Sequence, residues 1–219
     1  MDIIKDLNNS YINAKKHASE LLKNRGQVSS GVSVSKLPPH QRLVPAMVAM
    51  PPIVSKYPHV EKSEWGLYLY GNVENETHLN WKTFLELPSK DYEVDFHCVT
   101  SWSKLGQSFT GVNFCEMIKL CSPRESTRFV IFESYDGYTT NVSYKELQDK
   151  LCFIAFKMDG SDIVDKYGGP VRAVIPHLYG WKSAKHLKAI RFSEVDELGF
   201  WEVRGYHNHG DPWKEERYS

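Results

Sequence analysis

Residues 92–103 read Tyr92-Glu93-Val94-Asp95-Phe96-His97-Cys98-Val99-Thr100-Ser101-Trp102-Ser103. Apolar and polar side chains alternate up to Cys98, which predicts a strand with one buried face. The strand should end at Cys98 and present its thiol to a glycine-containing loop that reaches Gly111. A thiol in that place can serve as a ligand or a nucleophile, although a single cysteine is more often a small buried hydrophobe.

Further strands and short helices are predicted downstream of this segment. Apolar runs rich in β-branched and aromatic residues predict strands at residues 66–70, 128–134, 151–158, 171–176 and 187–192. Helices are predicted at residues 81–87, with Asn80 as a cap, at 112–120, and after Ser143, where Glu146 completes a capping box. Because the elements do not alternate regularly, the sequence indicates an α+β fold with a substantial sheet.

The N-terminal region differs from the rest of the chain in pattern. Residues 1–26 have the pattern of a helix, and residues 27–36 that of a linker rich in serine and valine. Residues 37–60 hold 6 of the 11 prolines, which excludes regular helix and central strand and predicts an ordered loop. We therefore predict an N-terminal helix and linker over residues 1–36, followed by a single domain over residues 37–219.

Composition limits the classes of partner. Basic and acidic residues both number 27, so no net charge favours nucleic acid or an anionic membrane. A membrane-spanning helix needs a run of about 18 apolar residues, and the sequence contains none. The residues after Met1 lack the apolar stretch of an export signal, and the 4 cysteines match no zinc or disulfide pattern. We expect a cytoplasmic protein with reduced, mostly buried thiols, without a membrane span and without a nucleic-acid partner.

Two short segments can bind an anion. In Gly168-Gly169-Pro170-Val171-Arg172 the glycines allow a close backbone approach, and Arg172 at a strand start suits a phosphate or an ordinary ion pair. The turn Tyr179–Lys185 offers Lys182, Ser183 and Lys185 as phosphate donors, although alone it resembles a solvated basic turn.

Three histidines are further candidates, with weaker support. His207 and His209, with Asp211, can bind a metal, although such short motifs more often reflect surface polarity. His97 can orient a group beside Cys98, or it can lie on the solvent side of its strand.

Taken in order along the chain, these segments resemble the molybdopterin-binding domain of the sulfite oxidase superfamily. The resemblance covers roughly residues 60–219 and rests on His97–Ser103, Phe132–Ser134 with Asp136–Thr140, Gly168–Arg172, Tyr179–Lys185, and Gly199–His207 with Gly210–Trp213. Each motif is modest, but the shared order makes the set specific.

The resemblance implies a mixed, β-rich fold and a molybdenum-molybdopterin cofactor. In that family one cysteine thiolate binds molybdenum, and this position falls on Cys98, which would be both metal ligand and catalytic residue. A soft, deprotonated thiolate suits such a metal. Further cofactor-binding residues are implied at Ser134, Tyr167, Arg172, Ser183, Ala184 and Lys185. Tyr167 stands where relatives usually have His or Asn, and His40–Arg42 in the proline-rich loop is a further suspected contact.

The implied reaction is two-electron oxygen-atom transfer to or from a small substrate, with an electron-transfer partner that the sequence does not identify. Sulfite oxidases carry an arginine-rich stretch after the metal cysteine, whereas this chain has Trp102-Ser103-Lys104. The spacing Cys-x-x-x-Trp-Ser is similar to that of bacterial reductases of protein methionine sulfoxide. Reduction of a sulfoxide or N-oxide is therefore one alternative, and a non-catalytic molybdopterin-binding module is another. Trp102 and the C-terminal tail are expected to shape the substrate entrance.

Overall fold

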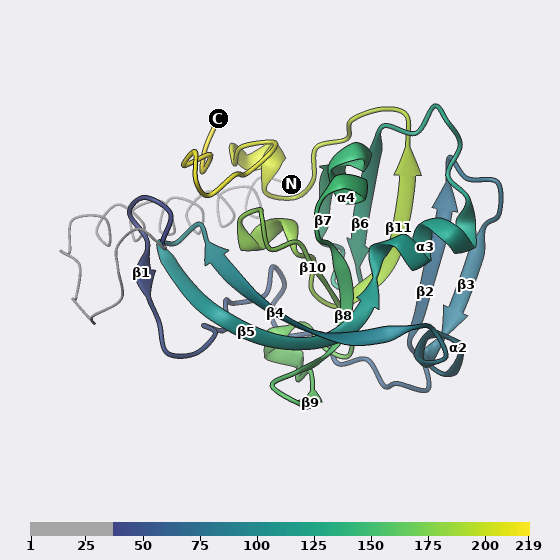
Figure 1. Ribbon diagram of the computed structural model, residues 1–219, viewed down its shortest axis with the longest axis horizontal. Helices are drawn as coiled ribbons and strands as arrows, with labels where there is room; N and C mark the ends of the chain where they lie inside the picture. Colours follow the sequence, from purple (N-terminus) through teal and green to yellow (C-terminus); the bar gives the residue numbers. More distant parts are fainter. Residues whose placement is uncertain (1–36) are drawn as a thin grey trace.

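A computed structural model describes residues 37–219, which form two β-sheets joined by short helices (Figure 1). The helix predicted over residues 1–26 and the linker predicted over 27–36 lie outside the described residues. This architecture agrees with the mixed, β-rich, sulfite-oxidase-like fold that the resemblance implied. No helix in residues 37–219 is long and apolar enough to cross a bilayer.

The first sheet carries the strand predicted from residues 92–98. Its hydrogen-bonded order is β1 (Arg42–Leu43), β5 (Trp102–Asn113), β8 (Phe153–Met158) and β10 (Arg172–Val174). Strand β4 (Ser89–Cys98) also pairs with β5, and β9 (Ser161–Asp162) pairs with β8. Figure 1 shows β4 and β5 as a long curved hairpin, and the start of β5 pairs with both the end of β4 and β1.

The second sheet stands beside this hairpin. Its order is β3 (Thr77–Asn80), β2 (Gly66–Gly71), β11 (Leu187–Ser193), β6 (Phe129–Ser134) and β7 (Thr139–Ser143). Strands β2 and β11 are parallel, and the other pairs are antiparallel. Strand β10 belongs to the first sheet and β11 to the second, so residues 175–186 between them link the two sheets. This segment contains the basic turn Tyr179–Lys185.

Three α-helices and three 3₁₀ turns complete the described chain. They are α2 (Trp81–Leu85), α3 (Phe114–Cys121), α4 (Tyr144–Asp149), η2 (Asp165–Tyr167), η3 (Gly180–Lys182) and η4 (Glu202–Arg204). Asn80 caps α2 as predicted, because its side chain accepts a hydrogen bond from the Thr83 amide at 3.0 Å. The capping box predicted at Ser143 is wrong, because Ser143 makes no side-chain cap and Glu146 pairs with Lys150 and His209 instead.

The glycine-containing loop predicted between Cys98 and Gly111 is wrong for most of its length, because strand β5 begins at Trp102 and only residues 99–101 form a turn. Polar residues and Gly106 hide the strand from its sequence pattern, whereas Phe109 and Val112 are fully buried. Gly111 sits at a register shift against β8, and a Cβ atom there would lie 2.6 Å from the Ile154 carbonyl oxygen. The glycine is therefore required by the close approach of two strands, not by a loop.

Candidate active site

A tight turn presents the Cys98 thiol. Cys98 pairs with Trp102 across the β4–β5 hairpin, so Val99, Thr100 and Ser101 form a three-residue connection. Ser101 adopts the left-handed conformation with φ 64°, as the last residue of such a connection usually does. The Cys98 side chain is 7% exposed, and its Sγ lies 3.1 Å from Thr100 Oγ1. The thiol is therefore largely enclosed by its own turn and by the walls of a pocket.

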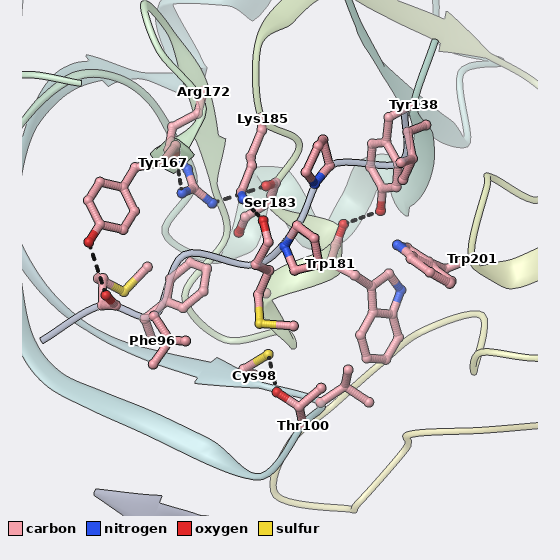
Figure 2. A pocket seen from close by; sticks show the side chains of 18 of the residues that line it. Phe96, Cys98, Thr100, Tyr138, Tyr167, Arg172, Trp181, Ser183, Lys185 and Trp201 are labelled. Atoms are coloured by element: carbon pink, nitrogen blue, oxygen red, sulfur yellow. Dashed lines mark hydrogen bonds between the residues drawn. The ribbon is translucent and has the colours of Figure 1, made fainter. Parts of the chain in front are cut away.

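The pocket holds about 860 Å³ of space between its walls and its opening to solvent. Figure 2 shows Cys98 at its floor, with Arg172 and Lys185 on one side and Trp201 and Tyr138 on the other. Of the cofactor-binding residues that the resemblance implied, those that line it are Cys98, Tyr167, Arg172, Ser183 and Lys185. The fold thus brings a thiol, two cations and two hydroxyls from four separate segments into one cavity.

Arg172 is a buried cation without a carboxylate partner among residues 37–219. Its side chain is 1% exposed and donates to the carbonyl oxygens of Tyr167 at 2.8 Å and Ser183 at 3.2 Å. Its guanidinium also lies 5.3 Å from the ring centre of Phe96. Burial lowers the pKa of the Arg172 guanidinium to about 10, so it stays charged at neutral pH. An uncompensated buried charge is costly, and an anion bound in the pocket would offset it.

Lys185 and Tyr167, on the same side of the pocket as Arg172, are hydrogen-bonded to the proline-rich loop. Lys185 Nζ donates to the Met50 carbonyl oxygen at 3.1 Å, and the Tyr167 hydroxyl donates to that of Met47 at 3.2 Å. Ser183 Oγ accepts from the Ile175 amide at 3.0 Å. The loop therefore reaches the pocket through residues 47–53, and not through His40–Arg42, which the sequence suggested.

Two of the implied cofactor-binding residues lie outside the pocket lining. Ser134 ends β6, and its buried hydroxyl has no hydrogen-bond partner among the described residues. Ala184 is 1% exposed, and its carbonyl oxygen accepts from the Ala173 amide at 2.9 Å. Their roles in binding a cofactor stay predictions.

Lys182 does not face the pocket, although the sequence offered it as a phosphate donor. Its Nζ lies 2.6 Å from Glu202 Oε1, and both side chains are fully buried. The same carboxylate oxygen accepts from Thr140 Oγ1 at 2.8 Å and from Trp181 Nε1 at 3.0 Å. Lys182 therefore stabilises the wall behind the pocket, and Lys185 is the lysine of this turn that lines the cavity.

Breaking this buried ion pair is expected to cost stability. Lys182→Met should lower the free energy of unfolding by about 3–5 kcal/mol, because it leaves the Glu202 charge buried without its partner. The double variant Lys182→Met/Glu202→Gln should recover most of that loss, since glutamine keeps an acceptor for Trp181. Urea denaturation of the three proteins measures the difference, and a single variant as stable as the parent would disprove this role for the pair.

An aromatic wall faces the cations across the pocket. The ring of Tyr206 lies 5.1 Å from that of Trp181 and 4.9 Å from that of Trp201, measured between ring centres. The Tyr138 hydroxyl donates to the Trp181 carbonyl oxygen. Trp102 and the tail residues Trp201 and Tyr206 line the cavity. The sequence pattern did not single out Tyr138 or Trp181 for this wall, although the density of aromatic residues is a signal for one.

The structure places the three weaker histidine candidates in protein hydrogen bonds or ion pairs. His97 is buried, with Nδ1 2.7 Å from Ser103 Oγ, and burial lowers its pKa, so its side chain is not on the solvent side of the strand. His209 lies between two carboxylates, with Nδ1 2.6 Å from Glu216 and Nε2 3.0 Å from Glu146. No group of three His, Cys, Asp or Glu side chains within residues 37–219 is placed to hold a metal. The surroundings of His207 and His209 therefore agree with the favoured interpretation of this motif as surface polarity, and not with the metal site that was its alternative.

His209 predicts a pH-dependent stability instead. Hydrogen bonds to Glu146 and then Glu216 raise its pKa above the ordinary 6.5, since both ring nitrogens donate only in the imidazolium. This contribution is complete below about pH 6.5 and is lost as pH rises through the higher folded-state pKa. The free energy of unfolding should therefore fall as the pH rises above about 6.5, and His209→Gln should reduce that slope.

The matched control is His78→Gln. The His78 ring stacks on Tyr68, whereas the His209 ring lies between two carboxylates. Urea midpoints measured across this pH range should keep the parent slope in the His78 variant. An undiminished slope in the His209 variant would contradict the prediction.

A family model described as the oxidoreductase molybdopterin binding domain matches residues 54–201. The chain belongs to this family. This molybdopterin-binding oxidoreductase is 31% identical over 195 residues to the uncharacterized oxidoreductase YuiH of Bacillus subtilis, a match that covers 89% of the chain and 98% of YuiH. It is 24% identical over 166 residues to the protein-methionine-sulfoxide reductase catalytic subunit MsrP of Campylobacter jejuni, covering 68% of the chain and 56% of MsrP.

The fold of this oxidoreductase is also found in a solved structure. The sulfane dehydrogenase SoxCD from Paracoccus pantotrophus superposes with a TM-score of 0.59 at 14% identity, over 64% of this chain and 41% of that one. The cofactor of the family is molybdenum held by molybdopterin. The pocket fits this group, because it offers a soft sulfur donor at its floor and the buried Arg172 guanidinium, which has no carboxylate partner among residues 37–219.

Proposed function

We propose that Cys98 is the protein ligand of molybdenum and that Arg172 and Lys185 bind the phosphate of the pterin cofactor, in an enzyme that transfers an oxygen atom in a two-electron reaction. The observation that carries this proposal is the pocket shared by the thiol and the buried Arg172 guanidinium, which has no carboxylate partner in the described part of the chain. A planar guanidinium fork matches phosphate oxygens, and a thiolate matches a soft metal.

Side chains in different parts of the cavity would bind the metal and the pterin. Cys98 would hold the metal at the floor, and Tyr167 and Ser183 would contact the pterin beside Arg172. Ser134 and Ala184 remain predicted contacts of the same group. When bound, the molybdenum cofactor supplies the redox chemistry, and the chain supplies orientation and a site of low water content. The aromatic wall would exclude water from the space above Cys98.

A neutral sulfoxide or N-oxide is the second candidate substrate, and the position of the charges favours it. The lysine and arginine that line the pocket are Lys185 and Arg172, and a cofactor phosphate would occupy both. The opposite wall is aromatic, and the buried Trp102 Nε1 has no hydrogen-bond partner among the described residues. An indole N–H can donate to a neutral oxygen acceptor, whereas a sulfite anion would lack a counter-charge there.

The cellular setting is also proposed. We place the enzyme in the cytoplasm, since all 4 cysteines are free thiols. Its electron partner would be a separate protein or small carrier. A non-catalytic role is not proposed, because the family and the relative that spans nearly the same length are described as oxidoreductases.

Metal and pterin analysis of the purified protein tests the cofactor proposal. Molybdenum and pterin in equal amounts, close to one per chain, are expected. Steady-state assays then separate the substrates: methionine sulfoxide with reduced viologen should turn over faster than sulfite with an electron acceptor. A protein purified from a molybdenum-replete host without either component would contradict the proposal, and faster sulfite oxidation would overturn the preference for a neutral substrate.

A further inference from the structure

The turn that carries Cys98 is held by residues near both ends of the described part of the chain. The Cys98 carbonyl oxygen accepts from Ser101 N at 3.1 Å and from Gln41 Nε2 at 3.0 Å. The Val99 carbonyl oxygen accepts from Arg217 Nη1, in the C-terminal tail. Figure 1 shows the loop around β1 and the yellow C-terminal tail flanking this end of the β4–β5 hairpin.

The two donors are buried and fixed in place. Gln41 is 3% exposed, and its Oε1 accepts from Ser103 Oγ at 3.3 Å. Arg217 is 2% exposed, and its guanidinium carbon lies 5.0 Å from the Tyr179 ring centre. Arg217 Nη2 also donates to the Pro39 carbonyl oxygen at 3.4 Å. One guanidinium thus connects the thiol-bearing turn, the tail and the proline-rich loop.

The backbone of the turn explains why such support is needed. Ser101 holds φ at 64° although it has a side chain, and it is 1% exposed. Left-handed conformations at residues other than glycine persist where the surrounding structure determines them. The Ser101 carbonyl oxygen also accepts from the Arg42 amide at 3.0 Å. The carbonyl groups of Cys98, Val99 and Ser101 are therefore all bonded to groups from outside the turn.

We infer that Gln41 and Arg217 are positioning residues, which hold the β4–β5 turn so that the Cys98 thiol faces the pocket. Neither residue lines the cavity, so each acts through the backbone of the turn and not on the substrate. The inference rests on the proposed role of Cys98 as metal ligand. It makes residues at both ends of the described chain part of the metal site.

The test measures thiol reactivity in metal-free protein, which needs no turnover. Arg217→Met and Gln41→Met should each raise the alkylation rate of Cys98 by iodoacetamide roughly tenfold, because the turn loses a charged or neutral hydrogen bond that keeps it closed. Arg217→Lys should restore part of the protection, since an ammonium can still donate to one carbonyl. Mass spectrometry of the Cys98 peptide gives the rates, and molybdenum content after loading should fall in the same order.

Internal controls separate local loosening from unfolding. Cys121 is fully buried and reports global opening, whereas Cys115 is exposed and reports reagent activity. Arg204→Met is the matched control variant, because Arg204 is a tail arginine that donates to the Phe200 carbonyl oxygen in its own turn. Acceleration confined to Cys98 in the Gln41 and Arg217 variants supports the inference. Equal acceleration at Cys98 and Cys121, or none at either, overturns it.

Failure of the positioning role can be distinguished from failure of the proposed function. A Cys98→Ala protein that still binds molybdenum like the parent would remove the metal-ligand role, whatever the alkylation rates. Unchanged alkylation in the Arg217 and Gln41 variants, beside loss of molybdenum binding in Cys98→Ala, would overturn only the positioning role.

Discussion

Cys98→Ala is expected to abolish oxygen-atom transfer while the protein stays folded. Removal of a residue that hydrogen-bonds to a metal ligand commonly lowers metal affinity or activity by about 10–100-fold. Removal of the ligand itself should therefore lower turnover by more than about 100-fold. The stability cost should be small, because the change removes one sulfur atom from a side chain that borders a cavity. Viologen-linked turnover of methionine sulfoxide and a urea unfolding curve measure the two effects.

The control for this variant is Cys115→Ala. Cys115 is an exposed free cysteine on helix α3 and does not line the pocket. It should keep the activity of the parent under the same assay. Parental turnover in a folded Cys98→Ala protein would refute the assignment of the metal ligand.

Arg172→Lys is expected to weaken cofactor binding by roughly 10- to 150-fold, which corresponds to about 1.5–3 kcal/mol for a hydrogen bond to a charged group. The substitution keeps a positive charge but removes the planar fork that can bind a phosphate at two points. It also removes donors that the Tyr167 and Ser183 carbonyl oxygens use. Titration of the metal-free protein with molybdopterin measures the affinity.

Arg191→Lys is the matched control for this substitution. Arg191 is also a strand arginine, but it pairs with Glu133 at 3.0 Å and Glu197 at 2.6 Å and lies outside the pocket lining. Its lysine variant should bind the cofactor as the parent does. Equal affinities in the Arg172 and Arg191 variants would show that Arg172 does not contact the cofactor.

Much of the fold could be predicted from sequence periodicity, because several strands have clear local patterns. The alternation of residues 92–98 correctly placed Cys98 at the end of β4, and apolar runs located β6, β8 and β11. Strand β5 was missed because its polar residues and glycines carry no such pattern, and pairing with β4 and β8 determines its conformation. Contacts outside the local motif also matter at Ser143, where Glu146 pairs with Lys150 and His209 and the predicted cap does not form.

The site could be predicted only in part, for a similar reason. Local chemistry left Arg172 open between a phosphate and an ion pair and favoured a solvated turn for Lys185. The family resemblance implied both as cofactor-binding residues, and the fold places both in the pocket with Cys98. Local sequence cannot show that Lys182 turns toward Glu202 while Lys185 lines the cavity, since both are lysines of one turn. It also cannot show which part of the proline-rich loop reaches the pocket, because that choice depends on contacts with residues more than a hundred positions away.

Molybdenum K-edge X-ray absorption of the loaded protein tests the central claim most directly. The spectra of the parent and of Cys98→Ser should differ by one sulfur neighbour per molybdenum, which the serine variant replaces with an oxygen neighbour or loses. An equal number of sulfur neighbours in the two proteins would contradict the claim that the Cys98 thiolate binds the metal.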